Sequence, residues 1–106
     1  DIEDKKMKIK AKIRRDMAVV KALAKHPMET GLRKDKKTDK IIPAKFIKEL
    51  VCKHGDKVVY HADFGRSVSK NPYVAFTFAG AKKGDSIAMT WTDSDEETLT
   101  VETVIK

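Results

Sequence analysis

The side chains that could bind a metal or act as a nucleophile are one cysteine, Cys52, and three histidines, His26, His54 and His61. If the segments around Cys52 and His61 form one hairpin, Cys52, His54 and His61 could share a face as a three-ligand metal set. However, Cys52 and His54 are only two residues apart, and no fourth ligand is evident. No cluster of cations lowers the pKa of Cys52 toward that of a reactive thiol. We therefore favour a small buried hydrophobe beside two surface histidines, and we expect no metal and no cofactor.

The carboxylates that gather in one segment are Asp93, Asp95, Glu96 and Glu97. Acid–base catalysis by paired acids needs surroundings that separate their pKa values, which a water-exposed turn does not provide. We interpret the segment as a solvated turn, with calcium binding as the alternative. The sequence also contains no GxSxG nucleophile motif and no glycine-rich phosphate loop. We therefore expect no catalytic residues and no enzymatic activity.

Positive charge is concentrated in the first part of the chain. Residues 1–45 contain 15 Lys and Arg against 7 Asp and Glu, whereas residues 46–106 contain 8 against 9. A sequence-neutral nucleic-acid binder needs cations interleaved with aromatic side chains. Here all seven aromatic residues lie in the second part, from Phe46 to Trp91. This segregation argues against nucleic-acid binding, which remains the alternative function, as a basic nucleic-acid or anionic-surface binding domain.

Two segments in the first part predict different elements. Residues 7–13 alternate between apolar and basic side chains, which is typical of a half-buried strand whose lysine row protects an edge of a sheet. Residues 17–25 fit both a helical stripe and a strand, and the His26-Pro27 step ends either one. Residues 28–40 are polar and indicate a long exposed loop, a length that is usually functional or disordered.

The second part of the chain predicts a succession of strands. Residues 47–54 and 57–64 flank Gly55-Asp56, a two-residue hairpin signal. In the register we expect, Cys52 faces Val59 and Val51 faces Tyr60. The better candidate for a core face then consists of Ile47, Val51, Val58, Tyr60, Ala62 and Phe64. Leu50, Cys52 and Val59 share the opposite face with His54 and His61.

Three further strands are expected over residues 73–78, 87–91 and 99–105, the first of them with the apolar sequence of a central strand. Short strands at this spacing, separated by turn signals, favour an all-β fold, an immunoglobulin-like β-sandwich of about seven antiparallel strands. At 106 residues, the chain has room for one such domain, spanning residues 1–106.

Four motifs resemble the SoxZ family, the smaller subunit of the SoxYZ sulfur-carrier complex of the thiosulfate-oxidation (Sox) pathway. They are HPMETGLRKD (26–35), IPAKFI (42–47), SKNPYVAF (69–76) and GAKKGD (80–85), followed by the late tryptophan strand at Trp91. The similarity extends from about Met7 to Trp91 in the right order. Two departures are Phe64-Gly65-Arg66, where a Trp-Gly-Pro is expected, and Cys52, where an aliphatic residue is expected.

The resemblance implies an immunoglobulin-like sandwich that forms a heterodimer with SoxY. In that complex, a C-terminal cysteine arm of SoxY carries covalently bound sulfur intermediates between the pathway enzymes. This chain ends in Val101 to Lys106 without a glycine-flanked cysteine, so it is expected to be the non-catalytic scaffold subunit. The family is periplasmic and is exported together with its partner, which fits the lack of an apolar signal segment at residues 1–5. No membrane and no nucleic-acid partner is expected, and contacts with other Sox enzymes would be transient.

The residues expected to contact the partner fall into two groups. The first is exposed surface near the partner or its arm: His26, Met28, Glu29, Arg33, Ser69, Lys70 and Asn71. The second is an apolar patch buried against the partner: Leu50, Cys52 and Val59.

Overall fold

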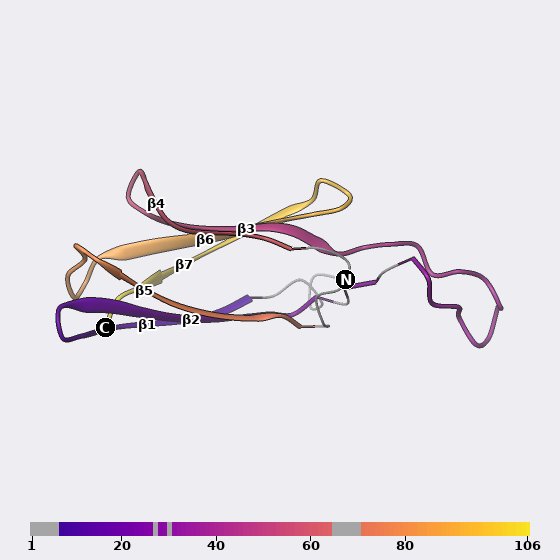
Figure 1. Cartoon of the computed structure of the whole chain (residues 1–106), viewed down its shortest axis with the longest axis horizontal. Helices are drawn as coiled ribbons and strands as arrows, with labels where there is room; N and C mark the ends of the chain where they lie inside the picture. The colour runs from indigo at the N-terminus through magenta and orange to yellow at the C-terminus, as the bar shows by residue number, and fades with distance from the viewer. Residues whose placement is uncertain (1–6, 27, 30, 65–70) are drawn as a thin grey trace.

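Two β-sheets face each other in a computed structural model of the chain, which describes residues 7–26, 28–29, 31–64 and 71–106 (Figure 1). Within these residues there are seven strands and no helix, and therefore no helix able to cross a membrane. One sheet has the order β1-β2-β5 and the other β4-β3-β6-β7, with every pairing antiparallel. The strands are β1 (Met7–Arg14), β2 (Met17–Ala24), β3 (Ile47–His54), β4 (Lys57–Asp63), β5 (Tyr73–Ala79), β6 (Ser86–Asp93) and β7 (Thr98–Val104). The expected fold class is confirmed.

The first hairpin resolves the ambiguous segment 17–25 in favour of a strand. Arg15 and Asp16 both have positive φ, at 51° and 66°, and they connect Arg14 to its partner Met17. A two-residue turn with this geometry matches the right-handed twist of paired strands. Alternate residues of β2 then point into the core: Ala18, Val20, Ala22 and Ala24. β1 lies at the edge of its sheet, as its lysine row predicts.

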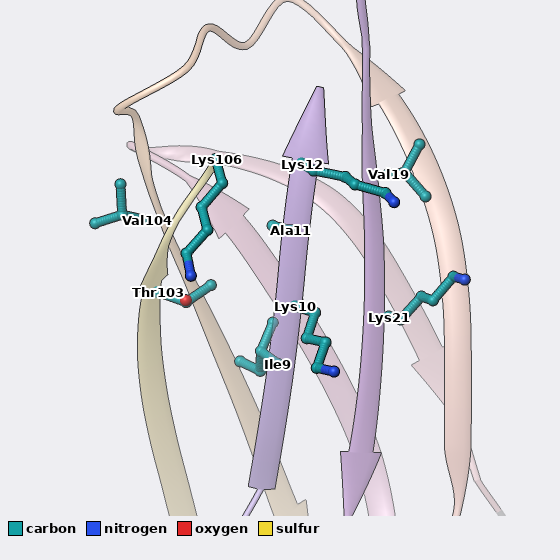
Figure 2. A pocket seen from close by; sticks show the side chains of 9 residues that line it. All are labelled: Ile9, Lys10, Ala11, Lys12, Val19, Lys21, Thr103, Val104 and Lys106. Carbon is teal, nitrogen blue, oxygen red and sulfur yellow. The ribbon is translucent and has the colours of Figure 1, made fainter. Parts of the chain in front are cut away.

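The edge strand β1 is joined to the end of the chain. The backbone N–H of Ile13 donates to the carbonyl of Lys106, and the N–H of Lys106 donates to that of Ala11. A groove of about 600 Å³ lies along this junction (Figure 2). Its lining combines apolar side chains of β1, β2 and β7 with the side chains of four lysines, Lys10, Lys12, Lys21 and Lys106.

The predicted register of the second hairpin is wrong, and the predicted core face is wrong for Val51 and Val58, whereas Ile47, Tyr60 and Phe64 do contact the core. Cys52 pairs with Tyr60 and Val51 with His61, because the register shifts between Cys52 and Lys53 and leaves Val59 as an extra residue. A second irregularity between Ile47 and Glu49 puts Ile47 and Leu50 on the same face. A one-residue slip moves every side chain of a strand to the other face. The inward face of β3 therefore consists of Ile47, Leu50 and Cys52.

The core lies between the two sheets and is centred on β6. Ile87, Met89 and Trp91 alternate inward and are almost completely buried. At the open edge of the sandwich, the rings of Tyr60 and Phe76 stack with centroids 4.1 Å apart and planes 4° from parallel. Tyr60 belongs to one sheet and Phe76 to the other, so this stack connects the two layers where no strand pairing does.

β5 is an edge strand, which corrects the prediction of a central one. Its sequence is apolar because Val74, Phe76 and Phe78 point toward the core, whereas Tyr73 on the outer side is 59 % exposed. The strand contains neither charge nor proline, the usual protections of an exposed edge.

The segment between β2 and β3 projects beyond the sheets as a long loop (Figure 1). Isolated bridges pair Glu29 with Lys45 and Lys34 with Ile41, so the two sides of the loop run antiparallel. Gly31 has φ +85°, and an added Cβ would lie 3.2 Å from that of Ala44, which explains the glycine. Most of the loop is exposed, as predicted, including Leu32 at 82 % and Ile41 at 59 %.

Candidate partner-recognition site

His26 lies two residues beyond β2, buried at the end of the sandwich from which the long loop projects. Its Nδ1 accepts a hydrogen bond from the backbone N–H of Met28 at 3.0 Å. This bond requires the ring proton to be on Nε2, which lies 3.7 Å from Oδ2 of Asp93. The ring also meets Trp91 edge to face, with centroids 5.2 Å apart. His26 thus connects the loop to the core and to the acidic end of β6.

Asp93 is the last residue of β6, and it is completely buried. Its Oδ1 accepts hydrogen bonds from the backbone N–H groups of Asp95 and Glu97, at 2.9 and 3.0 Å. Its Oδ2 lies 3.2 Å from Nζ of Lys45, in addition to facing His26. A buried carboxylate needs such partners to offset the loss of water. The prediction of a wholly solvated acidic turn is therefore wrong for Asp93.

Lys45 connects the returning side of the loop to this turn. Its Nζ lies 2.9 Å from Glu97, 3.0 Å from Asp95 and 3.2 Å from Asp93. Partial burial alone would lower the pKa of the Lys45 ammonium, but hydrogen bonds to the three carboxylates raise it by more, so that the net direction is upward. Lys45 therefore remains charged throughout the physiological range. We call His26, Lys45 and Asp93 the buried polar cluster.

Met28 shows the largest difference from its expected place. It is buried, with φ at +50°, and its Sδ accepts a hydrogen bond from the backbone N–H of Ile47 at 3.3 Å. Both Met28 and His26 were expected on the surface, and that expectation is wrong. The hydrogen bond from the Met28 N–H to His26 Nδ1 holds the Met28 backbone in this conformation. The Met28 side chain then points into the core.

Glu29 and Arg33 form a pair on the side of the loop that water reaches. Arg33 donates from Nε to Oε1 at 3.1 Å and from Nη2 to Oε2 at 2.5 Å. The hydrogen bond and the charge of Glu29 raise the pKa of Arg33 above its ordinary value. The two-point contact fixes the guanidinium plane at the loop surface, and the assignment of Arg33 to partner contact stays a prediction.

The remaining predicted residues are distributed as follows. Asn71 has φ at +53° and forms two hydrogen bonds with His26. Its side-chain Oδ1 accepts from the backbone N–H of His26 at 3.0 Å, and its own backbone N–H donates to the carbonyl of His26. Ser69 and Lys70 lie outside the described residues. Leu50 and Cys52 are core residues of the isolated chain, and Val59 is half-buried beside them. The expectation that Leu50 and Cys52 form an outer patch available to a partner is therefore wrong, because the shifted hairpin register turns them inward.

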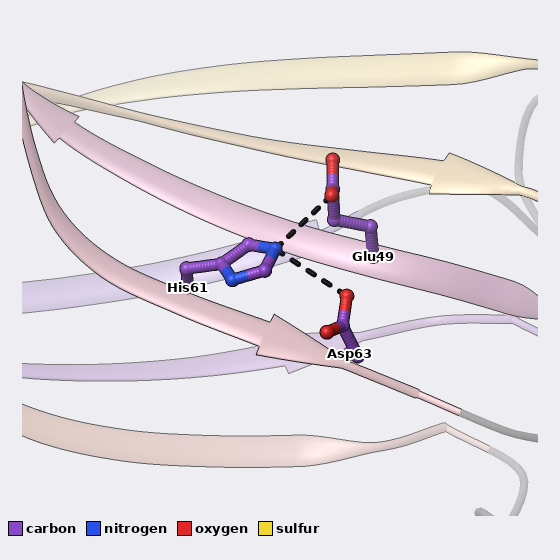
Figure 3. Close-up of side chains that lie close together, drawn as sticks. All are labelled: Glu49, His61 and Asp63. Atoms are coloured by element: carbon purple, nitrogen blue, oxygen red, sulfur yellow. Dashed lines mark hydrogen bonds and ion pairs between the residues drawn. The ribbon is translucent and has the colours of Figure 1, made fainter.

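The three side chains considered as a metal set are not brought together. Cys52 is in the core, His54 lies 2.9 Å from Asp85, and His61 is on the outer face of β4. His61 instead faces Glu49 and Asp63, at 3.0 and 3.4 Å (Figure 3). These three residues could present one ligand atom each to a divalent ion. All are substantially exposed, and the hydrogen bond of His61 to Glu49 together with its proximity to Asp63 suffices to explain the arrangement.

Burial makes Cys52 an unreactive thiol, and it raises the pKa of this group to about 11. At pH 7 we expect no measurable alkylation by iodoacetamide in the folded protein and rapid alkylation in urea. The ordinary thiol pKa is 9.0, so the folded state favours the protonated form. Stability should consequently fall as pH rises from 9 through 11, and a Cys52→Ala variant should lack this part of the decline. Alkylation of native protein at the rate of the unfolded chain would contradict this assignment.

The sequence analysis missed Lys45 and the role of Asp93. A signal for Asp93 was present, because it continues the inward alternation of Ile87, Met89 and Trp91. An acidic residue in an inward position must have a polar partner. No pattern identified Lys45 as that partner, because the two positions are far apart in the sequence and only the loop's return path brings them together.

These features define a class of protein: a two-sheet β-sandwich whose loop end is fixed by a buried polar cluster. Comparison with protein families then places the chain, because residues 7–104 match the family model described as "Sulphur oxidation protein SoxZ". The chain belongs to the SoxZ family and is thus a component of the Sox sulfur-oxidation system. The resemblance inferred from the sequence motifs is confirmed. No curated protein matches the chain.

Proposed function

We propose that this chain is the non-catalytic scaffold subunit of a heterodimer with a SoxY-like protein. The partner carries sulfur intermediates on a cysteine of its C-terminal arm, and this chain helps to present that arm to other Sox enzymes. Membership of the SoxZ family is the observation on which the proposal depends. The thiol of Cys52 is buried and protonated, so it is unsuited to carry sulfur itself.

The buried polar cluster supports a scaffolding role. Through hydrogen bonds and ion pairs, it connects the loop start at His26, the loop return at Lys45 and the β6–β7 turn at Asp93. Asp93 restrains the backbone of the turn through its Oδ1, and its Oδ2 joins the side chains of His26 and Lys45 to that turn. A loop fixed in this way loses little conformational freedom when a partner binds, which favours affinity. We further propose that the chain works in the periplasm and is exported with its partner.

The direct test is to mix the purified chain with the SoxY-type protein encoded in the same genome. Size-exclusion chromatography with light scattering should give a 1:1 complex at micromolar concentration, and calorimetry should give its Kd. A SoxY-type variant whose arm cysteine is replaced by serine should bind equally well, because the scaffold contact does not require the thiol. Two monomers eluting separately at that concentration would refute the proposal.

Arg33 offers a test of the loop as a contact surface. We expect Arg33→Ala to weaken the complex by roughly tenfold, since arginine is enriched among residues that dominate interfaces. Stability should change little, because the Arg33 side chain is 64 % exposed to water. Arg33→Lys should restore only part of the affinity, as lysine cannot form the two-point contact. The matched control is Lys37→Ala, also exposed on the loop. Equal affinities for the Arg33→Ala and Lys37→Ala variants would show that Arg33 does not contact the partner.

A further inference from the structure

The sheet β1-β2-β5 is unusual in its charge. None of the residues in its three strands is Asp or Glu, although the chain as a whole has 16 acidic residues. Its outward positions include five cations, four of them in one row on β1. They are Lys8, Lys10, Lys12, Arg14 and Lys21. This sheet therefore presents only positive charge.

The cations are placed where they repel one another. Lys10 is directly opposite Lys21 in the β1–β2 register, and like charges in that relation destabilise a sheet. Lys10, Lys12, Lys21 and Lys106 also line the groove along β1 (Figure 2). Among the described residues, none of these four lysines pairs with an Asp or Glu. A carboxylate from outside the chain would relieve this repulsion.

Next to the cation row lies an uncharged area. Three outward side chains of β2 are only partly exposed and apolar: Met17, Val19 and Leu23. They pair across to the outward positions of β5, where Tyr73 is followed by Ala75, Thr77 and Ala79. An apolar centre beside a charged rim is the usual anatomy of a protein–protein interface. We call this surface, with the cation row, the basic sheet face.

We infer that the basic sheet face docks a carboxylate-bearing surface of the carrier subunit, an inference that rests on the proposed function. The acidic side chains of the partner would lie along β1 and in the groove, against Lys10, Lys12 and Lys21. Its apolar side chains would cover Met17, Val19 and Leu23. The outward side chain of Tyr73 on β5, which is paired with Leu23 and is 59 % exposed, would be covered as well.

Two other occupants fit the surface less well. A second copy of the chain would bring the same all-cationic sheet and a net charge of +7 against it. Nucleic acid would satisfy the lysines, but it would place phosphates against the apolar side chains of β2. A single-strand binder also needs outward aromatic rings for stacking, and here Phe76 and Phe78 point inward, which leaves Tyr73.

Charge reversal on β1 tests the inference in the intact chain. The double variant Lys10→Glu, Lys12→Glu should weaken binding to the SoxY-type subunit by roughly a hundredfold at low salt. Added salt should reduce the difference in Kd between this variant and the wild-type chain. Folding should be preserved, because the carboxylate introduced at position 10 would face Lys21 and replace a repulsive pair with an attractive one. The matched control is Lys53→Glu, Lys57→Glu, which makes the same change in net charge on the β3–β4 hairpin. It should bind within about threefold of wild type.

A second variant tests the apolar centre without altering the cation row. Val19→Glu should weaken the complex by roughly tenfold or more, whereas Val58→Glu on exposed β4 should not. Calorimetry measures Kd, and thermal melts verify that each variant is folded.

The possible results separate this inference from the proposed function. If the wild-type chain does not bind the subunit, the proposed function fails and the inference fails with it. If the wild-type chain binds and the β1 and Val19 variants bind within about twofold of it, the complex stands but the docking face is elsewhere. If filter binding shows that the β1 reversal abolishes affinity for DNA while leaving the complex intact, the face is a nucleic-acid surface and the inference is overturned.

Discussion

Replacing Asp93 with alanine should lower the free energy of unfolding by about 3–4 kcal/mol, a large part of the stability of a domain of this size. The substitution removes the acceptor for two backbone N–H groups, those of Asp95 and Glu97. Hydrogen bonds to a charged acceptor are worth about 1.5–3 kcal/mol each, and both of these bonds are partly buried. Loss of the contact between Lys45 and Oδ2 of Asp93 adds to the effect.

Urea denaturation followed by circular dichroism would measure this change. The control is Asp95→Ala, because Asp95 also contacts Lys45 but is exposed, so that its loss should cost less than about 1 kcal/mol. Asp93→Asn retains an acceptor for the turn, so its loss in the free energy of unfolding should lie between those of Asp93→Ala and Asp95→Ala. A decrease below about 1 kcal/mol for Asp93→Ala would show that the buried polar cluster does not stabilise the loop end.

Most of the fold could be predicted because its strands follow simple periodic patterns. Alternation predicted β1, β6 and β7, and the Gly55-Asp56 turn predicted the second hairpin. In β1, β6 and β7, one face is apolar enough to identify the inward side. The ambiguous segment 17–25 is a strand because the tight turn at Arg15 and Asp16 pairs it with β1.

The faces of β3 could not be predicted, because bulges are not encoded in the alternation itself. Residues 47–54 contain apolar side chains at both parities, so the sequence favours neither face. The irregularities after Ile47 and at Cys52, in the pairing of β3 with β6 and β4, determine which of its side chains point inward. For the same reason, Cys52 and His61 were placed on one face, although they lie on opposite faces of the sheet.

The long loop between β2 and β3 was predicted from its length and polarity, but its internal geometry was not. A methionine between proline and glutamate gives no indication of a positive φ, so Met28 was expected outside. Its burial depends on the tertiary contacts of His26 and Ile47. In the proposed contact, exposed residues such as Arg33 lie above a base of buried residues that includes His26 and Met28. Substitutions in the base should act on the partner only through the shape of the loop.

His26 provides the clearest test of that relation. His26→Ala should lower the free energy of unfolding by about 3 kcal/mol, because it leaves the buried Met28 N–H without its acceptor and removes the edge contact with Trp91. His26→Asn places an oxygen near the position of Nδ1 and should recover about half of the loss. His26→Gln reaches toward Asp93 instead and should not restore the Met28 bond.

Amide hydrogen exchange distinguishes this mechanism from a general loss of stability. The Met28 N–H should be protected in the wild type and in His26→Asn, and it should exchange rapidly in His26→Ala and His26→Gln. Affinity for the SoxY-type subunit should follow the protection of this amide rather than the overall stability, because the loop must keep its shape to present Arg33. The matched control is His54→Ala, which loses a partly exposed pair with Asp85 and a tilted ring contact with Phe78 but, in the described part of the chain, no contact with the loop. Unchanged exchange at Met28 in His26→Ala would mean that the histidine does not position the loop.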